Sequence, residues 1–386
     1  MKTKYILIVN AGSSSLKIKL FNFKLKEAFG GIIEKIGLGG SFIAVEKQKN
    51  PPSLKLRRTG KKTINQKIKD HQEALQAVVD CLVENGIELK QIVKIGHRVV
   101  HGGEKFVKPT LITSAVLREL AQFNRLAPLH NPHNLAGIEA CLKLFPNAKN
   151  YAAFDTAFHS TMPDFACQYP LPEKFYKKMN IRRYGFHGLS HQYVSLEAAK
   201  RLKIKKPNLI ACHLGGGCSI CAIKKGKSVD TSMGFTPLEG LMMMTRTGDI
   251  DAGIILYLAR KGFTLSEIDD WLNKKSGLLG VSGLKDMRDI MIANGYAIPG
   301  YSTQIKFTDE QKKSAKLALE MFVYRIKKYI GAYSIILGKV DAIVFTAGIG
   351  ERNKDVRNLI VRHLPNKPKV LVIPADEEMM IAGLIR

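Results

Sequence analysis

The chain lacks any apolar run long enough to cross a membrane, and the run nearest its start is short. Tyr5–Val9 is apolar and follows Lys2 and Lys4, as at the start of a secretion signal, but Asn10 ends it. Such a run is shorter than the apolar core that a secretion signal needs. No other segment approaches the length of a membrane span. The sequence therefore predicts a cytoplasmic protein with no membrane partner.

Cysteine is also scarce, with six residues in a chain of 386. This number in a chain of this length does not indicate a disulfide framework. Cys218 and Cys221 form a C-x-x-C pattern, which is found at zinc and redox sites. However, no second cysteine pair lies nearby, and residues three apart on a strand point to opposite faces. We interpret both cysteines as buried apolar residues.

Acidic residues are far fewer than basic ones, 33 against 60, which gives a net charge of +27. Part of the excess lies in residues 47–69, which contain nine Lys or Arg residues and no acid. A basic segment can bind nucleic acid or an anionic membrane. This one has no aromatic residues to stack on bases and contains Pro51, Pro52 and Gly60. We therefore predict a solvated loop without a nucleic-acid partner, and a positive field that attracts anionic substrates.

Three consecutive glycines stand between two predicted strands in the second half of the chain. Leu209–Cys212 and Ile220–Ile223 are apolar, and Gly215–Gly217 lies between them. Such a loop can approach a ligand closely and direct several backbone N–H groups at it, which suits a phosphate. Downstream, Arg246 and Asp249 add a cation and a carboxylate. Phosphoryl transfer uses these groups to neutralise charge and to position a metal.

The same pattern of strand, small-residue loop and strand occurs at the start of the chain. Tyr5–Val9 and Leu16–Phe23 flank a loop of small residues, and Gly12–Ser15 matches Gly216–Ser219. A repeat about half a chain apart suggests two related halves that face a shared nucleotide, and coincidence is the alternative because there are only two copies.

The length predicts two domains, which we place at residues 1–150 and 151–386. Strands alternate with helices in both halves, and each half begins with hairpins, so we predict an α/β fold with mixed sheets. Thr308 and Gln311 have the spacing of a capping box at the start of a long helix. Helices are predicted at about 71–85, 114–126, 134–144, 251–260, 265–274 and 308–337.

Ten short segments between residues 8 and 378 form the most specific pattern in the chain. They are IVNAGSSSLK, GHRVVHGGE, LAPLHNP, FDTAFHSTMP, RRYGFHGLSH, KSVDTSMGFTPLEGL, TRTGDID, SGLLGVSG, DAIVFTAGIGE and IPADEE. In this order they resemble the acetate kinase family, whose superfamily also contains sugar kinases, actin and heat-shock ATPases. The resemblance covers essentially the whole chain.

This resemblance implies a duplicated ribonuclease-H-like (actin-like ATPase) fold, with the acceptor on the N-terminal domain and the nucleotide on the C-terminal domain. It also implies a homodimer. The implied reaction is reversible in-line transfer of a phosphoryl group from ATP to acetate, giving ADP and acetyl phosphate, with Mg²⁺ or Mn²⁺ as the metal. Acetate is already ionised at neutral pH, so no general base is needed. Cations and dipoles around the transferring group would lower the barrier.

The resemblance also implies roles for individual side chains. Arg98 would bind the acceptor carboxylate, and Arg246 would stabilise the transition-state oxygens. His187 would stabilise the transition state, and His130 would line the site. Asp155 would orient Arg98 or belong to the metal shell, since no base is required.

Further residues are implied in binding. Asn10 and Glu377 match the magnesium side of the family's site, and a hard cation with water and phosphate ligands needs few protein groups. The acceptor's methyl group would lie against Val100, Leu129, Phe186 and Pro237. The implied nucleotide residues are His213, Leu214, Gly215, Gly216, Gly217, Asp286, Met287, Arg288, Gly348, Ile349, Gly350, Glu351 and Arg352.

Some of these residues have alternative interpretations. His187 and His191 have the spacing of metal ligands on a helix, but no acidic ligand lies near them in the sequence. Glu378 is interpreted as a solvated charge at a helix start. The remaining histidines are interpreted as buried side chains with satisfied hydrogen bonds, namely His101, His133, His159 and His213.

The chain departs from the family pattern in the nucleotide segments. Gly216 and Arg352 each stand where the family usually has Asn, so nucleotide affinity and choice are open. Propionate kinase is the alternative within the family, because one methylene in an apolar pocket changes binding by only about 1–3 kcal/mol. An ATP-driven conformational protein, a nucleic-acid-binding protein on the same fold and a degenerate kinase are alternatives of other classes. The presence of Arg98, Asp155, His187 and Arg246 disfavours them.

Overall fold

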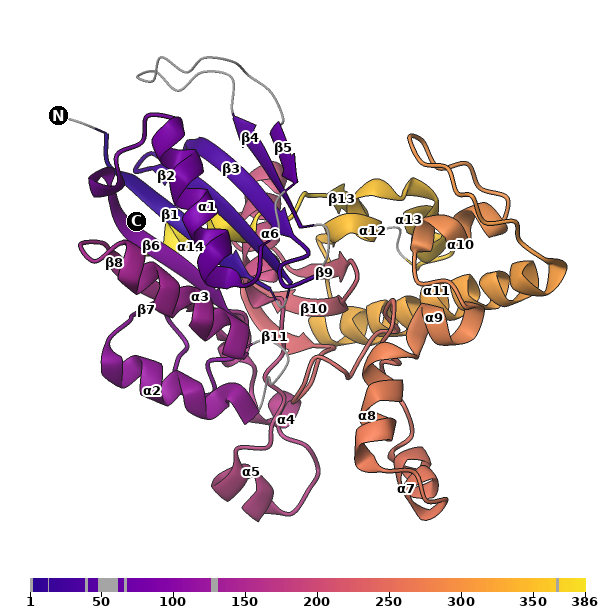
Figure 1. Ribbon diagram of the computed structural model, residues 1–386. Helices are drawn as coiled ribbons and strands as arrows, with labels where there is room; N and C mark the ends of the chain where they lie inside the picture. Colours follow the sequence, from indigo (N-terminus) through magenta and orange to yellow (C-terminus); the bar gives the residue numbers. More distant parts are fainter. Residues whose placement is uncertain are drawn as a thin grey trace. The chain divides into compact units, whose positions relative to one another are not determined.

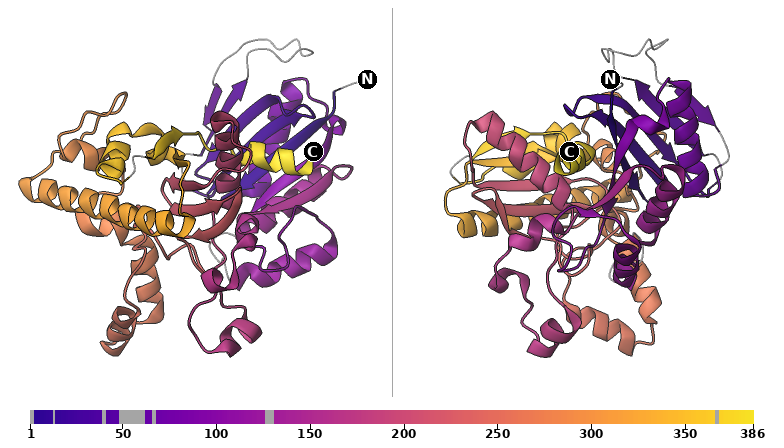
Figure 2. Two further views of the ribbon diagram at one scale, coloured as in Figure 1. Left: turned by 180° about the vertical axis from the view of Figure 1, so that it is seen from behind. Right: turned by 90° about the vertical axis from the view of Figure 1, so that its left-hand side faces the viewer.

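Each half of the chain is built around one mixed β-sheet (Figures 1 and 2). The computed structural model describes residues 3–12, 14–38, 41–47, 62–65, 68–125, 131–365 and 368–386. The chain divides into two units, one of Met1–Ala157 with Asp376–Arg386 and one of Phe158–Ala375.

The first unit has a sheet with the strand order β5-β4-β3-β2-β1-β6-β8-β7. Strand β1 pairs antiparallel with β2 and parallel with β6, which in turn pairs parallel with β8. The strands are β1 (Tyr5–Ala11), β2 (Ser15–Asn22), β3 (Glu27–Glu34), β4 (Phe42–Lys47), β5 (Lys62–Asn65), β6 (Ile92–Val99), β7 (Thr110–Leu111) and β8 (Lys149–Phe154). The helices are α1 (His71–Glu84), α2 (Ser114–Gln122), α3 (Asn131–Leu144) and α14 (Glu377–Ile385).

Helices cover both faces of this sheet. Side chains alternate between the two faces along each strand, so an apolar strand such as β1 presents apolar side chains on both faces for helices to cover. Leu7 and Val9 of β1 belong to one buried cluster with residues of α1 and α3. On the other face, α14 packs so closely on β6 that a Cβ atom at Gly96 would lie 2.6 Å from Ile381. The absence of a side chain at Gly96 therefore lets α14 lie directly on the strand.

The second unit has a sheet with the strand order β11-β10-β9-β12-β13. Helix α6 packs on one face of it, and α11 contacts β9 and β10. The strands are β9 (Leu209–Leu214), β10 (Cys218–Lys224), β11 (Lys227–Thr231), β12 (Ala342–Thr346) and β13 (Lys369–Val372). The helices are α4 (Asp164–Cys167), α5 (Glu173–Met179), α6 (Gly188–Leu202), α7 (Ala252–Arg260), α8 (Leu265–Lys274), α9 (Gly277–Ser282), α10 (Met287–Ala293), α11 (Asp309–Leu337), α12 (Ala347–Arg352) and α13 (Lys354–Val361).

The two sheets share one topology. In the first unit β3-β2-β1-β6-β8 runs as two antiparallel pairings followed by two parallel ones, and β11-β10-β9-β12-β13 repeats this order. The repeat seen in the sequence is thus a duplication of the whole sheet. The predicted duplicated ribonuclease-H-like α/β fold with mixed sheets is confirmed.

Local signals in the sequence place most helix ends correctly. Thr308 Oγ1 accepts a bond from the backbone N–H of Gln311 (3.1 Å), and the Gln311 side chain accepts one from Thr308 (3.2 Å), so the predicted capping box starts α11. The helix predicted at 114–126 ends at Gln122 in a 3₁₀ turn. The helix predicted from Asn134 already begins at Asn131, because Pro132 lies in its first turn, where a missing N–H costs nothing.

The two units differ in extent from the domains placed at residue 150. Strand β8 pairs with β6, so the first unit continues to Ala157. Residues Asp376–Arg386, which the sequence analysis placed with the second domain, belong to the first unit, because α14 packs on β1 and β6. Most of the basic stretch 47–69 lies outside the described residues.

All six cysteines are buried, and for Cys218 and Cys221 this confirms the interpretation as buried apolar residues. Burial raises the pKa of the Cys218 and Cys221 thiols well above the ordinary value. Across the part of the chain that the structure describes, every helix is too short or too polar to span a bilayer.

Candidate active site

Three polar residues of the first unit meet at the carboxyl ends of adjacent strands. Asn10 is the sixth residue of β1, Arg98 lies near the end of β6, and Asp155 directly follows β8. The parallel register of these strands aligns Val9 with His97 and Arg98 with Ala153. Side chains at the carboxyl ends of neighbouring parallel strands share one edge of the sheet, which is where α/β proteins bind ligands.

Arg98 and Asp155 form a bidentate ion pair at this edge. Arg98 Nε donates to one oxygen of Asp155 (3.1 Å), and Nη2 donates to the other (2.5 Å). Asp155 is 1% exposed, and the Arg98 side chain is 19% exposed. Burial opposes the charge of Arg98, but the carboxylates of Asp155 and Glu377 outweigh it and raise the pKa of the guanidinium. Arg98 is therefore held as a cation in a single orientation.

The first residues of α14 bring two more carboxylates to this edge. Glu377 Oε2 lies 3.4 Å from Arg98 Nε. Glu378, interpreted from the sequence as solvated, is instead buried: Lys17 Nζ of β2 lies 2.7 Å from its carboxylate, and Asn10 Nδ2 donates to it at 3.4 Å. Burial alone would raise the pKa of Glu378, but the charge of Lys17 and its hydrogen bond lower it. The prediction failed because Lys17, whose side chain is partly exposed on β2, reaches the buried carboxylate of Glu378 and supplies its counter-charge.

The oxygen atoms here suit a hard cation. Asn10 Oδ1 lies 3.4 Å from Arg98 Nη1, so Asn10, Asp155 and Glu377 all present oxygens around one guanidinium. Among the described residues, no group of three or more His, Cys, Asp or Glu side chains could hold a metal by itself. This arrangement fits Mg²⁺, which keeps water and phosphate oxygens and needs few protein ligands.

Asn134, near the start of α3, forms hydrogen bonds with the backbone at the ends of both β1 and β6. Asn134 accepts a bond from the backbone N–H of Val100 (3.1 Å) and donates to the carbonyl of Ala11 (2.6 Å). Val100, one of the residues implied in acceptor binding, is buried. Leu129 and His130, which the sequence analysis placed at the acceptor methyl and in the catalytic set, lie outside the described residues.

In the second unit, the glycine loop, His187 and Arg246 converge. A Cβ atom at Gly217 would lie 3.5 Å from His187 Nε2 and 3.7 Å from Arg246 Nη1. His187 directly precedes α6 and has a left-handed backbone (φ 56°). The loop's backbone, an imidazole and a guanidinium thus surround one small volume, as a phosphate site requires.

Arg246 lies in a loop that the start of α9 fixes in place. Gly277 has φ 64°, and a Cβ atom there would lie 2.6 Å from the Arg246 carbonyl oxygen, so only glycine fits. Arg246 Nη1 donates to the carbonyl of Pro237 at 3.3 Å. No carboxylate of the described residues forms an ion pair with Arg246, and burial lowers its pKa. A half-buried cation without a counter-ion is ready to bind an anion.

Three histidines of this unit, His187, His191 and His213, lie together near Ser219. Ser219 Oγ lies 3.0 Å from His187 Nδ1 and 2.8 Å from His191 Nε2. The rings of His187 and His213 stack with centroids 4.1 Å apart, and Ser190 bonds to His213 (2.8 Å). One ring nitrogen of His187 and one of His191 form a hydrogen bond with Ser219. Among the described residues, no group of three or more His, Cys, Asp or Glu side chains could hold a metal, so metal chelation by this pair is not supported.

Of the remaining histidines, His159 matches its interpretation as a buried side chain with satisfied hydrogen bonds, His101 matches it in burial, and His133 does not match it. His159 bonds to Ser228 (2.8 Å) and to the carbonyl of Phe186 (3.1 Å). His101 is buried, and its Nδ1 accepts the N–H of Gly103 (3.0 Å). His133 is only partly buried and stacks on His71.

Two of the three implied nucleotide segments lie side by side. The register aligns Thr346 with His213, and a Cβ atom at Gly215 would lie 3.5 Å from the Cβ of Ala347. Glu351 accepts the N–H groups of Ala347 (2.7 Å) and Ala375 (2.8 Å), so it braces the turn that precedes α12. The Arg352 side chain is exposed, and Gly350 is buried.

The third segment, Asp286–Arg288, starts α10. Asp286 caps this helix, and Arg288 bonds back to it through Nη2 (2.6 Å) while lying over the ring of Tyr301. Met287 is buried.

The Acetokinase family profile matches residues 5–382 of this chain. The chain belongs to the acetokinase family. It is 46% identical to the acetate kinase of Caldicellulosiruptor saccharolyticus, over 98% of this chain and 97% of that one. The structure matches a propionate kinase from Francisella tularensis with a TM-score of 0.88 and 38% identity, covering 99% and 98% of the two chains. It matches Porphyromonas gingivalis acetate kinase with a TM-score of 0.83 and 38% identity, covering 98% of each chain.

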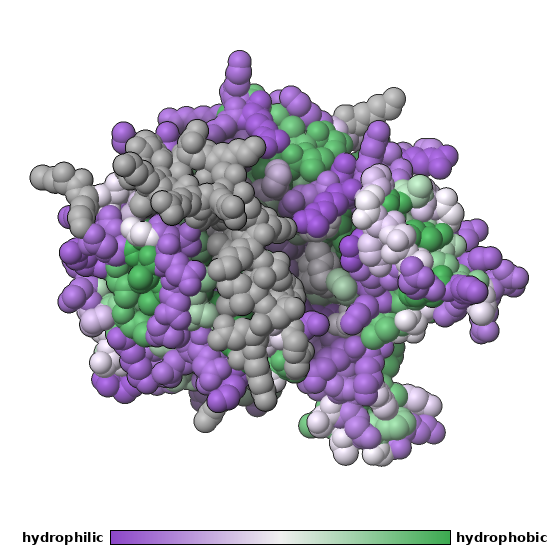
Figure 3. Space-filling model, turned by 45° about the horizontal axis from the view of Figure 1, so that its top comes forward, coloured by the Kyte–Doolittle hydropathy of each residue, from purple (hydrophilic) through white to green (hydrophobic). Residues whose placement is uncertain are grey.

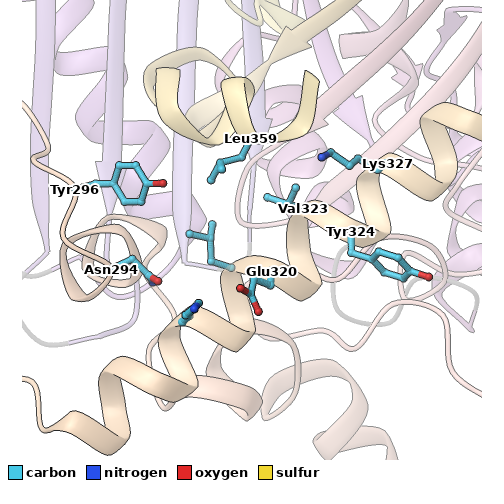
Figure 4. A pocket seen from close by; sticks show the side chains of 9 residues that line it. Asn294, Tyr296, Glu320, Val323, Tyr324, Lys327 and Leu359 are labelled. Atoms are coloured by element: carbon cyan, nitrogen blue, oxygen red, sulfur yellow. The ribbon is translucent and has the colours of Figure 1, made fainter. Parts of the chain in front are cut away.

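A separate cavity of about 650 Å³ lies beside α11 in this acetokinase (Figure 4). In the close-up, α11 contributes Glu320, Val323, Tyr324 and Lys327 from one side, and Tyr296 and Leu359 lie across from them. None of the implied nucleotide residues lines it.

Three residues with a structural role at these sites were not expected from the sequence, namely Lys17, Ser219 and Gly277. Lys17 and Lys19 stand two apart on an otherwise apolar strand, which indicates charges on one face of the sheet. Ser219 follows the glycine loop at the start of a buried strand. No signal in the sequence identifies the close contact between Gly277 and the backbone of Arg246.

Proposed function

We propose that this acetokinase transfers the γ-phosphoryl group of ATP to acetate, forming acetyl phosphate and ADP, in a reversible reaction. The acetate oxygen forms the new bond to phosphorus while the bond to the ADP oxygen breaks, and that oxygen takes the electron pair. The convergence of Arg246, His187 and the loop at Gly217 is the observation that carries this proposal. These groups surround a volume suited to a transferring phosphoryl group.

In this reaction Arg246 neutralises charge on the phosphoryl oxygens. The guanidinium has no carboxylate partner among the described residues, so an incoming phosphate replaces no existing ion pair. His187 Nε2 and the backbone N–H groups of Gly215–Gly217 add further donors. The residues of α12 and the start of α10 bind the rest of the nucleotide.

Arg98 binds the acceptor carboxylate, and Asp155 orients it. Arg98 bonds to Asp155 through Nε and Nη2, so its third nitrogen, Nη1, lies on the side of Asn10. Asn10 and Glu377 would hold Mg²⁺, and the bound ion would neutralise phosphate charge. Because acetate is already ionised, none of these carboxylates acts as a base.

A hydroxamate assay tests this function. Hydroxylamine traps acyl phosphate, so product is measured with ATP, Mg²⁺ and acetate, propionate or butyrate. We expect acetate to be preferred to propionate by about tenfold in kcat/KM, because one methylene is worth about 1–3 kcal/mol in an apolar pocket. The structural match to a propionate kinase makes the opposite preference the second candidate.

No trapped product from any of the three acids, with ATP binding confirmed by calorimetry, would overturn the proposed reaction. A preference for propionate would keep the reaction and change the substrate. Phosphate release from ATP without any acid would instead support an ATP-driven conformational protein.

We also infer that this acetokinase acts as a cytoplasmic homodimer. Helix α7 has no buried residue, although its sequence AGIILYLAR is strongly apolar. With α8 it extends away from the rest of the second unit (Figure 1), and hydrophobic residues are exposed on this arm (Figure 3). Leu256 and Tyr257 are 57% and 58% exposed, and Leu265 is 75% exposed. A second copy of the chain would cover this apolar surface.

Replacing Leu256 and Tyr257 together with Asp is expected to convert the dimer to a monomer, because each charge would have to be buried in the interface. Light scattering after size-exclusion chromatography measures the mass. Phe165→Asp, at a residue of α4 that is 90% exposed, is the matched control and should leave the dimer intact. A wild-type protein that is monomeric at micromolar concentration would contradict the inference.

A further inference from the structure

Ser219 bridges two histidines and has only one proton to share. Its hydroxyl lies 3.0 Å from His187 Nδ1 and 2.8 Å from His191 Nε2, and all three residues belong to the second unit. A serine hydroxyl donates one hydrogen bond and accepts others. It therefore donates to one of the two rings and accepts from the other.

The local fold produces this arrangement. His187 precedes α6 and His191 lies one turn later, with the His191 N–H bonded to the His187 carbonyl (2.9 Å), so both rings face the same strand. Ser219 is the second residue of β10 and is paired with His213 of β9. Ser219 and His191 have no exposed surface, so water does not compete for the bonds.

The direction of these hydrogen bonds follows from the surroundings of Nδ1, the ring nitrogen of His191 that does not contact Ser219. His191 Nδ1 is buried and has no hydrogen-bond partner. His191 is neutral, since burial and the nearby His159 and His213 lower its pKa well below the ordinary value. A proton on Nδ1 would be a buried donor without an acceptor, which is rarer than an unpaired acceptor. The proton is therefore on Nε2 and is donated to Ser219.

Ser219 then donates its own proton to His187 Nδ1. A neutral His187 that accepts at Nδ1 carries its proton on Nε2. That nitrogen faces the glycine loop, 3.5 Å from the position of a Cβ atom at Gly217, beside Arg246 Nη1.

We propose that Ser219, supported by His191, is a positioning residue that fixes His187 as the Nε2–H tautomer, so that neutral His187 donates a hydrogen bond to the transferring phosphoryl group. The role of Ser219 rests on the proposed phosphoryl transfer, but the tautomer itself does not. His187 then needs no added proton to act as a donor.

Other titratable groups also face His187. His213 stacks on it from β9, and Arg246 approaches from the loop that α9 holds. Cys218, which precedes Ser219 on β10, points to the opposite face of the strand and donates to the carbonyl of Gly215 (3.3 Å). The thiol of Cys218 stays neutral because burial raises its pKa. Arg246 keeps its charge throughout the neutral range. Among the described residues, His213 is the histidine ring in direct contact with His187, so its signals have to be distinguished from those of His187.

The first measurement is ¹⁵N NMR of histidine-labelled wild-type protein, with the His187 signals assigned by comparison with His187→Gln. The chemical shifts of the two ring nitrogens distinguish the tautomers. We expect the neutral form of the His187 ring to carry its proton on Nε2. A proton on Nδ1 would overturn the proposal, whatever the activity, and His213→Gln identifies the signals of the neighbouring ring.

The second measurement is the pH dependence of acyl phosphate formation by Ser219→Ala relative to the wild type. The ratio at each pH cancels the ionisation of the substrates. We expect kcat to fall roughly ten- to a hundredfold at pH 8, as when an outer partner of a catalytic histidine is lost. The deficit should shrink as the pH falls, because an imidazolium carries a proton on both ring nitrogens and can donate from Nε2 without help from Ser219. The KM for ATP should change less than kcat.

Ser195→Ala is the matched control, because Ser195 is also a buried serine of this unit, on α6. Ser219→Thr keeps the hydroxyl and should recover most of the activity. A pH-independent ratio for Ser219→Ala, equal to that of Ser195→Ala, would overturn the proposal. If Ser219→Ala does not fold, the NMR measurement decides. An inactive wild type would contradict the proposed function but would leave the tautomer to be read from the spectrum.

Discussion

Replacing Arg246 with Ala is expected to lower kcat for acyl phosphate formation by roughly 1,000-fold. An arginine that stabilises the oxygens of a transferring phosphoryl group contributes about 10³–10⁵ in kcat. We expect the lower end, because His187 and the backbone of the glycine loop remain beside the same volume. The loss corresponds to about 4 kcal/mol of transition-state stabilisation.

The effect should fall on kcat more than on the KM for either substrate. An interaction that forms mainly in the transition state lowers kcat without weakening ground-state binding. Arg246→Lys should lie between the wild type and Arg246→Ala, because lysine keeps the charge but lacks the planar fork. Stopped hydroxamate assays over a range of ATP and acetate concentrations give both constants.

Arg362→Ala is the matched control, since Arg362 is an exposed arginine of the same unit, at the end of α13. It should keep wild-type activity. A loss in Arg246→Ala of less than tenfold would contradict a role in the transition state. A loss confined to KM would assign Arg246 to ground-state binding instead.

The sequence was sufficient to predict the duplicated sheet. Strand and loop patterns around Gly12–Ser15 and Gly216–Ser219 recur because each unit starts its sheet with the same antiparallel hairpin. The capping residues Thr308 and Gln311 predicted the start of α11, since capping depends on a few neighbouring residues. Signals that are local in the chain were therefore reliable.

Properties that depend on distant residues were not predictable in the same way. In the sequence, Glu378 has the local setting of a solvated charge at a helix start. It is a member of a buried ion pair because Lys17, 361 positions away in the chain, contacts its carboxylate. The assignment of residues 376–386 to the first unit likewise depends on the contact of α14 with β1 and β6. Ser219 has no sequence signature, because its role arises from the two histidines on either side of it.

Asp155→Asn is expected to lower kcat/KM for acetate by about 100-fold, with a much smaller change in the KM for ATP. Asn has nearly the same shape, but its amide offers one acceptor oxygen and places an NH₂ group against the N–H groups of Arg98. The two bonds of 3.1 and 2.5 Å cannot both be kept. A displacement of a positioning group by about 1 Å is enough to cost about 100-fold in rate.

The same substitution separates the two roles considered for Asp155. If Asp155 orients Arg98, excess Mg²⁺ will not restore activity, and Arg98→Lys will show a similar loss that does not add to that of Asp155→Asn in the double mutant. If Asp155 belongs to the metal shell, raising the Mg²⁺ concentration will recover activity. The charge geometry favours orientation, because both carboxylate oxygens of Asp155 are already bonded to Arg98. Stability should also fall by about 3 kcal/mol, since Arg98 loses its most buried counter-ion, so activity is compared at a temperature where all variants are folded.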